Sequence, residues 1–159
     1  MAWLRILAAV FAIALVTWLS VTGYVVAPLL FDTLDSVTAG QLVGRLLTIG
    51  NWIGLIGLTI VLLINLAGRK KQSVGLHHLS LLWLSGVLIA VSEFWLTPKM
   101  EAIKALHPQG LSPPSEPWQS FMMWHGIYQL LFLALIVILL VWAWLNLKSM
   151  INHNSAPLG

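Results

Sequence analysis

Charge is scarce in this sequence, since only 8% of its 159 residues are Asp, Glu, Lys or Arg. A soluble domain is about one quarter charged, because polar side chains must cover its surface. Hydrophobic residues instead make up 59% of the chain, and the mean hydropathy is +0.91. This composition excludes a water-soluble globular protein and leaves no basic surface for nucleic acid. It predicts an integral membrane protein whose principal partner is the lipid bilayer.

Cysteine is absent, which excludes disulfide bonds, thiolate metal sites and cysteine nucleophiles. Familiar catalytic patterns are missing too. We find no defensible Ser-His-Asp arrangement, no phosphate-binding glycine loop, no paired carboxylates on a helix face and no H-E-x-x-H spacing. An internal repeat and a second domain are not evident either. The sequence therefore favours a single-domain protein over residues 1–159 without enzymatic activity.

Four apolar segments are each long enough to cross a bilayer, which takes about 20 residues. The first is too long for a cleaved signal peptide and predicts an uncleaved signal anchor. Before the last segment, Pro98 and the spacing of Met100, Ile103 and Leu106 predict a short amphipathic helix at the membrane surface. We expect an all-α fold, an integral membrane four-helix bundle with helices over about residues 3–30, 42–67, 78–96 and 121–147.

Basic residues indicate how this bundle lies in the membrane. Arg5, the cluster at 69–71 and Lys148 all fall on one side of a four-span topology. Because positive residues in short loops mark the cytoplasmic side, both termini are predicted to be cytoplasmic. The connection between the first two segments is then on the outer side. In the second segment, Gly50 and Gly54 predict close approach of a neighbouring helix.

Polar residues from every apolar segment are expected towards the outer surface. Ionisable groups cost about 2.5–3.5 kcal/mol at the centre of a membrane helix, so each needs a reason to be there. In one interpretation Arg45 pairs with Glu93 or Asp32 and the cluster only fixes the order of the helices. In the other, an outward-facing pocket binds or helps move a small solute or ion, or supports a partner membrane protein. The candidate residues are Asp32, Arg45, Asn51, Glu93, His125 and Gln129.

A haem- or metal-binding redox protein that uses His125 is the alternative from another class. Imidazole and carboxylate suit a borderline divalent ion, which makes His125 and Glu93 candidate metal ligands. However, His77 and His78 lie at the opposite end of the bundle from His125. A bis-histidine haem would therefore need a dimer or a mixed ligand pair. A transport role would likewise suit a homo-oligomer, because four helices leave little room for alternating access.

Several motifs indicate a family resemblance. They are GYVVAPLLF and LDSVTAGQLVGRL over residues 23–46, SEFWLTP over 92–98 and FMMWHG over 121–126. Together they resemble an uncharacterised bacterial four-span membrane family that is similar to the transmembrane-protein-205-like proteins and, more distantly, to the CopD and HemJ groups. The resemblance implies a compact helical bundle in the bacterial inner membrane. Its distant members imply copper handling or haem-pathway chemistry, for which Met122 and Met123 beside His125 are the nearest copper-like feature.

Overall fold

The structure, a computed structural model, describes residues 2–68 and 76–154 and is helical throughout its regular elements. Four stretches are long and apolar enough to cross a membrane: Trp3–Thr33, Ser36–Leu66, Leu79–Ala105 and Glu116–Met150. The predicted all-α architecture of four membrane helices is confirmed. The elements are α1 (Ala2–Val21), η1 (Thr22–Val26), α2 (Ala27–Thr33), α3 (Ser36–Gly68), α4 (Leu76–Val91), η2 (Ser92–Leu96), α5 (Thr97–Ala105) and α6 (Glu116–Asn154).

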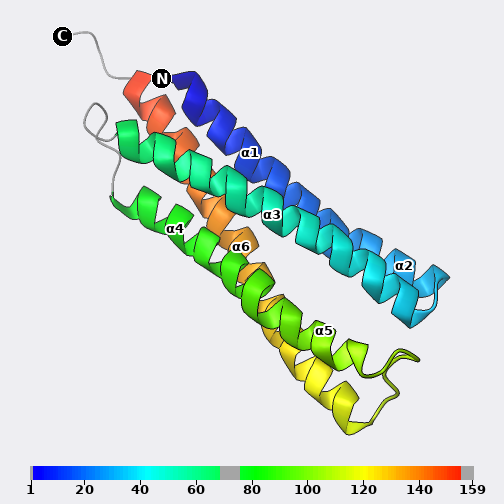
Figure 1. The fold of residues 1–159 in the computed structure, drawn as a ribbon. Helices are drawn as coiled ribbons and strands as arrows, with labels where there is room; N and C mark the ends of the chain where they lie inside the picture. Colours follow the sequence, from blue (N-terminus) through cyan, green and yellow to red (C-terminus); the bar gives the residue numbers. More distant parts are fainter. Residues whose placement is uncertain (1, 69–75, 155–159) are drawn as a thin grey trace.

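The helices form an elongated bundle in which α1 and α4 each pack against both α3 and α6 (Figure 1). The start of α1 and the end of α6 lie at the same end of it. There, Arg5 Nε donates a hydrogen bond to Asn146 Oδ1 at 3.1 Å, and Asn146 Nδ2 donates to the Arg5 carbonyl at 2.9 Å. At the other end, α2 packs on α3 and α5 packs on α6, and these two pairs diverge.

The helices run further than the apolar segments from which they were predicted. The short helix expected after Pro98 is present as α5, but it continues directly from η2. The third span is thus one uninterrupted helical path from Leu76 to Ala105. Hydropathy locates the part of a helix that contacts lipid, whereas the backbone can stay helical beyond it. The connection between α2 and α3 is correspondingly short, comprising Leu34 and Asp35.

Large apolar side chains lie both inside and outside the bundle. Leu19, Ile89 and Leu139 are fully buried, whereas Leu130 is 70% exposed and Leu63 is 59% exposed. Soluble monomers rarely expose extended apolar surface. In a bilayer the same surface contacts lipid tails, and the helices satisfy their own backbone hydrogen bonds. The distribution of exposed residues therefore agrees with the composition in indicating a membrane protein.

The first and third spans share an unusual feature, a π-helical segment directly before a proline. In η1 the Ala27 N–H donates to the Thr22 carbonyl, and in η2 the Thr97 N–H donates to the Ser92 carbonyl. Proline lacks an N–H and its ring would clash with the carbonyl four residues earlier, so a wider turn relieves the conflict. Pro28 and Pro98 follow the two π segments in the same position.

These two spans begin two structurally similar halves. Each half consists of a π-bulged helix followed by a straight one, α1–η1–α2 then α3, and α4–η2–α5 then α6. Sequence equivalences follow: Val-Thr-x-Tyr-x-x-x-Pro over 21–28 corresponds to Val-Ser-x-Phe-x-x-x-Pro over 91–98. An internal repeat was not evident from the sequence, and the shared π segments are what make this one visible. Only four positions of each segment match. Without the shared π segments, that similarity is too weak to identify a repeat from the sequence.

Candidate functional site

A polar cluster connects three helices in the interior of the bundle. Asn51 of α3 donates a hydrogen bond through Nδ2 to Glu93 Oε2 of η2 at 2.9 Å. The same amide nitrogen lies 3.4 Å from the hydroxyl oxygen of Tyr128 on α6. Asn51 and Tyr128 are only 3% and 6% exposed, and Glu93 is half-buried. Two of the predicted site residues, Asn51 and Glu93, are thus in direct contact.

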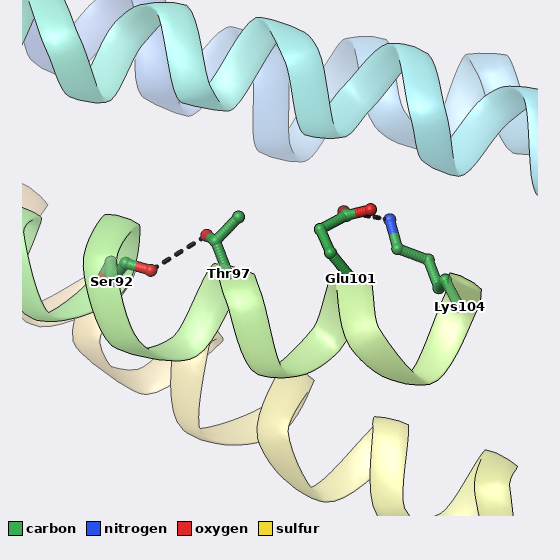
Figure 2. Close-up of polar contacts among 4 residues, drawn as sticks. All are labelled: Ser92, Thr97, Glu101 and Lys104. Carbon is green, nitrogen blue, oxygen red and sulfur yellow. Dashed lines mark hydrogen bonds and ion pairs between the residues drawn. The ribbon is translucent and has the colours of Figure 1, made fainter. Parts of the chain in front are cut away.

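The π-helical turn positions Glu93 in this cluster. Ser92 and Leu96 of η2 are buried in the core, and Glu93, next to Ser92, is directed to Asn51 of α3. A π turn contains one residue more than an α turn, so it shifts the helix face that follows. The Thr97 hydroxyl donates to the Ser92 carbonyl at 2.9 Å and stabilises the widened turn (Figure 2). π-Bulges are often found at functional sites.

Glu93 lies deeper along its helix than the sequence predicted. It was expected about one turn inside the end of an apolar segment that stops at residue 96. Because the helix continues to Ala105, Glu93 is near the middle of the Leu79–Ala105 span, about 18 Å along the axis from its end at 1.5 Å per residue. Asn51 is likewise at the middle of the Ser36–Leu66 span. The contact between them is therefore far from either helix end.

Charge pairing differs from the first interpretation of the sequence. In the described part of the chain the only ion pair joins Lys104 to Glu101 within α5. Arg45 and Asp32 are both exposed, on α3 and at the end of α2, and neither is paired with the other or with Glu93. Glu93 consequently has an amide donor but no basic partner among the described residues. The predicted helix-fixing ion pair of Arg45 is not present.

The two remaining candidates lie together on α6, apart from Glu93. The His125 ring stacks on Phe121 with centroids 5.7 Å apart, and its Nε2 is 3.3 Å from Gln129 Nε2. Gln129 is exposed, whereas Tyr128 beside it is buried. The contact with Asn51 is thus made by Tyr128, which lies one residue before Gln129, or about 100° around the helix. The face of α6 that points into the bundle carries buried apolar side chains at heptad-like spacing, namely Phe132, Leu135, Leu139 and Trp142. Tyr128 extends this column by one turn.

Metal ligands do not gather in the part of the chain that the structure describes. No group of three or more His, Cys, Asp or Glu side chains that could hold a metal ion occurs there. His77 and His78 belong to the first turn of α4, far along the bundle from His125, but their side chains lie outside the described residues. The basic cluster at 69–71 also lies outside the described residues.

A line of polar side chains extends from this cluster towards the end of the bundle at which α2 and α5 terminate. Thr97, Glu101 and Lys104 follow Glu93 at helical spacing and project from one side of the helix towards α3 (Figure 2). Glu101 Oε1 is 4.0 Å from the position that a Cβ on Gly44 would occupy. Gly44 is two helical turns before Asn51 on α3, with the half-buried Thr48 between them. We name Gly44, Thr48, Thr97, Glu101 and Lys104 the polar seam.

Four apolar helices with a polar cluster in their interior define this chain as a multi-pass membrane protein. The family model described as a domain of unknown function (DUF4149) matches residues 7–109, and the chain belongs to that family. The matched part contains Asn51 and Glu93 but ends before Tyr128 and α6. No curated protein and no solved structure matches the chain significantly. The resemblance to transmembrane-protein-205-like, CopD and HemJ proteins depends on the sequence motifs alone.

Proposed function

We propose that this protein binds a small cation, in the simplest case a proton, at the Glu93 carboxyl within the membrane. The observation that carries the proposal is the environment of Glu93: an amide donor from Asn51, and no basic side chain paired with it among the described residues. A carboxylate removed from water without a compensating charge is costly. Uptake of a proton or another small cation removes that cost.

The partners of Glu93 suit a group that changes its charge. The Asn51 amide is neutral and can donate to a carboxylate oxygen or to the carbonyl oxygen of the protonated acid. The Tyr128 hydroxyl, 3.4 Å from the same amide, can both donate and accept a hydrogen bond. A basic residue in either place would hold the carboxylate in its charged form. Neutral partners therefore keep Glu93 oriented in both states and favour reversible binding.

The proposal also includes the membrane in which the protein lies and its orientation there. The motifs shared with a bacterial four-span family support a place in the bacterial inner membrane. The basic residues support cytoplasmic termini, with the connection between α2 and α3 on the outer side. The cluster of Asn51, Glu93 and Tyr128 then faces the outer side through the polar seam. In this arrangement the protein binds a small cation from the outside and helps to move it or responds to it.

Infrared spectroscopy of the purified protein in lipid nanodiscs tests the proposal. We expect a carboxylic-acid C=O band from protonated Glu93 that disappears as the pH is raised and is missing in Glu93→Gln. Exchange of sodium for potassium or choline distinguishes a bound proton from a bound metal cation. Only a site that binds a metal cation would show a C=O band that depends on the salt. Glu101→Gln is the matched control, since that carboxyl is 56% exposed and paired with Lys104.

A purely structural role gives a different pattern. The amide oxygen of the replacement in Glu93→Gln can still accept the hydrogen bond from Asn51, so the fold and the melting temperature should change little. If the titrating band is the same in the wild type and in Glu93→Gln, the proposal is wrong. If the wild type shows no titrating band that Glu93→Gln lacks, Glu93 takes up no cation and the cluster merely holds the helices together.

A further inference from the structure

The two halves of the chain differ most where the polar cluster lies. The positions that correspond to Glu93, Thr97 and Glu101 in the first half are Gly23, Ala27 and Phe31. A Cβ placed on Gly23 would be 3.1 Å from the Phe132 ring of α6, so an apolar side chain fills the space that faces this position. One π-bulged helix therefore presents polar side chains to its neighbour, and its counterpart presents apolar ones.

The polar seam connects Glu93 with one end of the bundle. Thr97 is half-buried, and the two charged side chains beyond it are partly exposed, Glu101 by 56% and Lys104 by 30%. At the end of the bundle where α2 and α5 terminate, the helix pairs α2–α3 and α5–α6 diverge (Figure 1). The connection after α5 returns across it, because a Cβ on Gly110 would be 3.3 Å from Val37 at the start of α3. The polar side chains thus line the junction of two helix pairs rather than the outer surface of one helix.

From this asymmetry we infer that the polar seam is a water-accessible route by which Glu93 exchanges its cation with one side of the membrane only. This inference builds on the proposed function of Glu93. Polar groups in a membrane helix face protein or a water-filled cavity rather than lipid. Glu93, Thr97, Glu101 and Lys104 lie on one helix face opposite Gly44 and Thr48, and water between the helices would give these side chains further hydrogen-bond partners. Between Glu93 and the Arg5–Asn146 contact at the opposite end, buried apolar side chains such as Leu82, Ile89 and Leu139 occupy the described core.

The ion pair of Glu101 and Lys104 keeps the mouth of this route free of net charge. The two charges lie about two to three turns beyond Glu93 towards the end of α5, where any solute must pass. As a neutral pair they neither attract nor repel ions strongly. Removing one charge leaves the other unpaired, and a single unpaired charge changes the local concentration of ions of each sign by roughly three- to ten-fold. The route would then select by charge.

The absence of cysteine makes a direct test possible, since every introduced thiol is the only one in the chain. We would place single cysteines at Thr97, on one wall of the seam, and at Thr48, on the other. Vesicles of both orientations are treated with a membrane-impermeant cationic thiosulfonate. The expected result is labelling of Thr97→Cys and Thr48→Cys from the same side as Gly40→Cys, which reports the end of the α2–α3 hairpin, and not from the other side.

The internal repeat supplies the matched control. Ala27→Cys occupies the position equivalent to Thr97, after the first π segment and before the first proline. It should label at least ten-fold more slowly than Thr97→Cys, as should Leu130→Cys on the exposed face of α6. Equal rates at Thr97 and Ala27, with slow labelling of Thr48→Cys, would overturn the inference. Thr48→Cys leaves the π turn intact, so it answers the question even if Thr97→Cys does not fold.

The electrostatic effect of the Glu101–Lys104 pair is tested in the Thr97→Cys background with cationic and anionic reagents of equal size. Glu101→Gln should slow the cationic reagent and accelerate the anionic one, and Lys104→Gln should do the reverse. If both substitutions change both rates in the same direction, the ion pair shapes the route only sterically and does not filter charge. Labelling does not depend on the charge of Glu93. A seam that fails to label alongside a titrating Glu93 would therefore disprove the route alone.

Discussion

At the scale of the residue, Asp35 determines where the second membrane helix begins. Its Oδ1 accepts hydrogen bonds from the backbone N–H groups of Val37 at 3.1 Å and Thr38 at 3.0 Å, which have no carbonyl partner within the helix. Hydrogen bonds from the Thr38 hydroxyl and from these N–H groups lower the pKa of Asp35. The carboxylate also opposes the positive end of the helix dipole.

This cap leads to a pH-dependent prediction. Because the pKa of Asp35 is lower in the folded protein, its charge stabilises the fold above the ordinary aspartate range, and this contribution is lost as the pH falls through the lowered value. Asp35→Ala should lower the melting temperature more than Asp35→Asn, which keeps a capping oxygen. The difference between the wild type and Asp35→Asn should vanish in acid. Thermal unfolding in detergent at a series of pH values measures this, and a constant difference down to acid would contradict it.

At the scale of the element, α3 packs closely because three glycines face its neighbours. A Cβ on Gly50 would be 2.8 Å from the Trp18 ring, one on Gly54 would be 2.8 Å from Ile89 Cδ1, and one on Gly57 would be 2.0 Å from the Phe11 ring. Small residues at such spacing allow membrane helices to approach, since lipid gives no hydrophobic driving force between them. The packing role predicted for Gly50 and Gly54 agrees with these contacts.

The tightest of these contacts gives the second prediction. Gly57→Ala should destabilise the protein by about 1–3 kcal/mol, because the Phe11 ring must move out of its position between α1 and α3. Gly86→Ala is the control, since a Cβ there meets nothing within 4 Å, and alanine favours a helix over glycine by up to about 1 kcal/mol. Unfolding in mixed micelles measures both. Equal changes in stability in the two variants would show that the contact with Phe11 does not limit the substitution at Gly57.

At the scale of the whole molecule, both ends of the described chain lie on one side of the bundle (Figure 1). Arg5 is held at this end by Asn146 and Ser149, so the positive charges of Arg5 and Lys148 lie close to each other in depth. At the opposite end, Lys99 lies 4.8 Å from the centroid of the Trp124 ring and 5.6 Å from that of Trp95. These cation–π contacts stabilise the Lys99 charge where α5 packs on α6.

The orientation of the molecule gives the third prediction, which belongs to this scale. Reporter fusions after Gly40 and after Ser73 should show the first connection outside the cytoplasm and the second inside it. The physical reason is the cost of moving the basic residues at 69–71 across the membrane against its potential. A cytoplasmic signal from the Gly40 fusion would reverse the orientation. The water-accessible route would then open to the cytoplasm, while its chemistry would be unchanged.

The amino-acid sequence by itself determined the class of protein, the four membrane helices and the presence of Asn51 and Glu93 within apolar segments. Hydropathy is a sum over local residues, and a polar group inside an apolar run is visible without any partner. Only the tertiary structure decided which residues meet. The contact of Tyr128 with Asn51 depends on how α6 is rotated, and the position of Glu93 depends on a π turn that shifts the helix face. The absence of an Arg45–Glu93 pair among the described residues and the relation between the two halves also follow from packing, which acts between residues far apart in the chain.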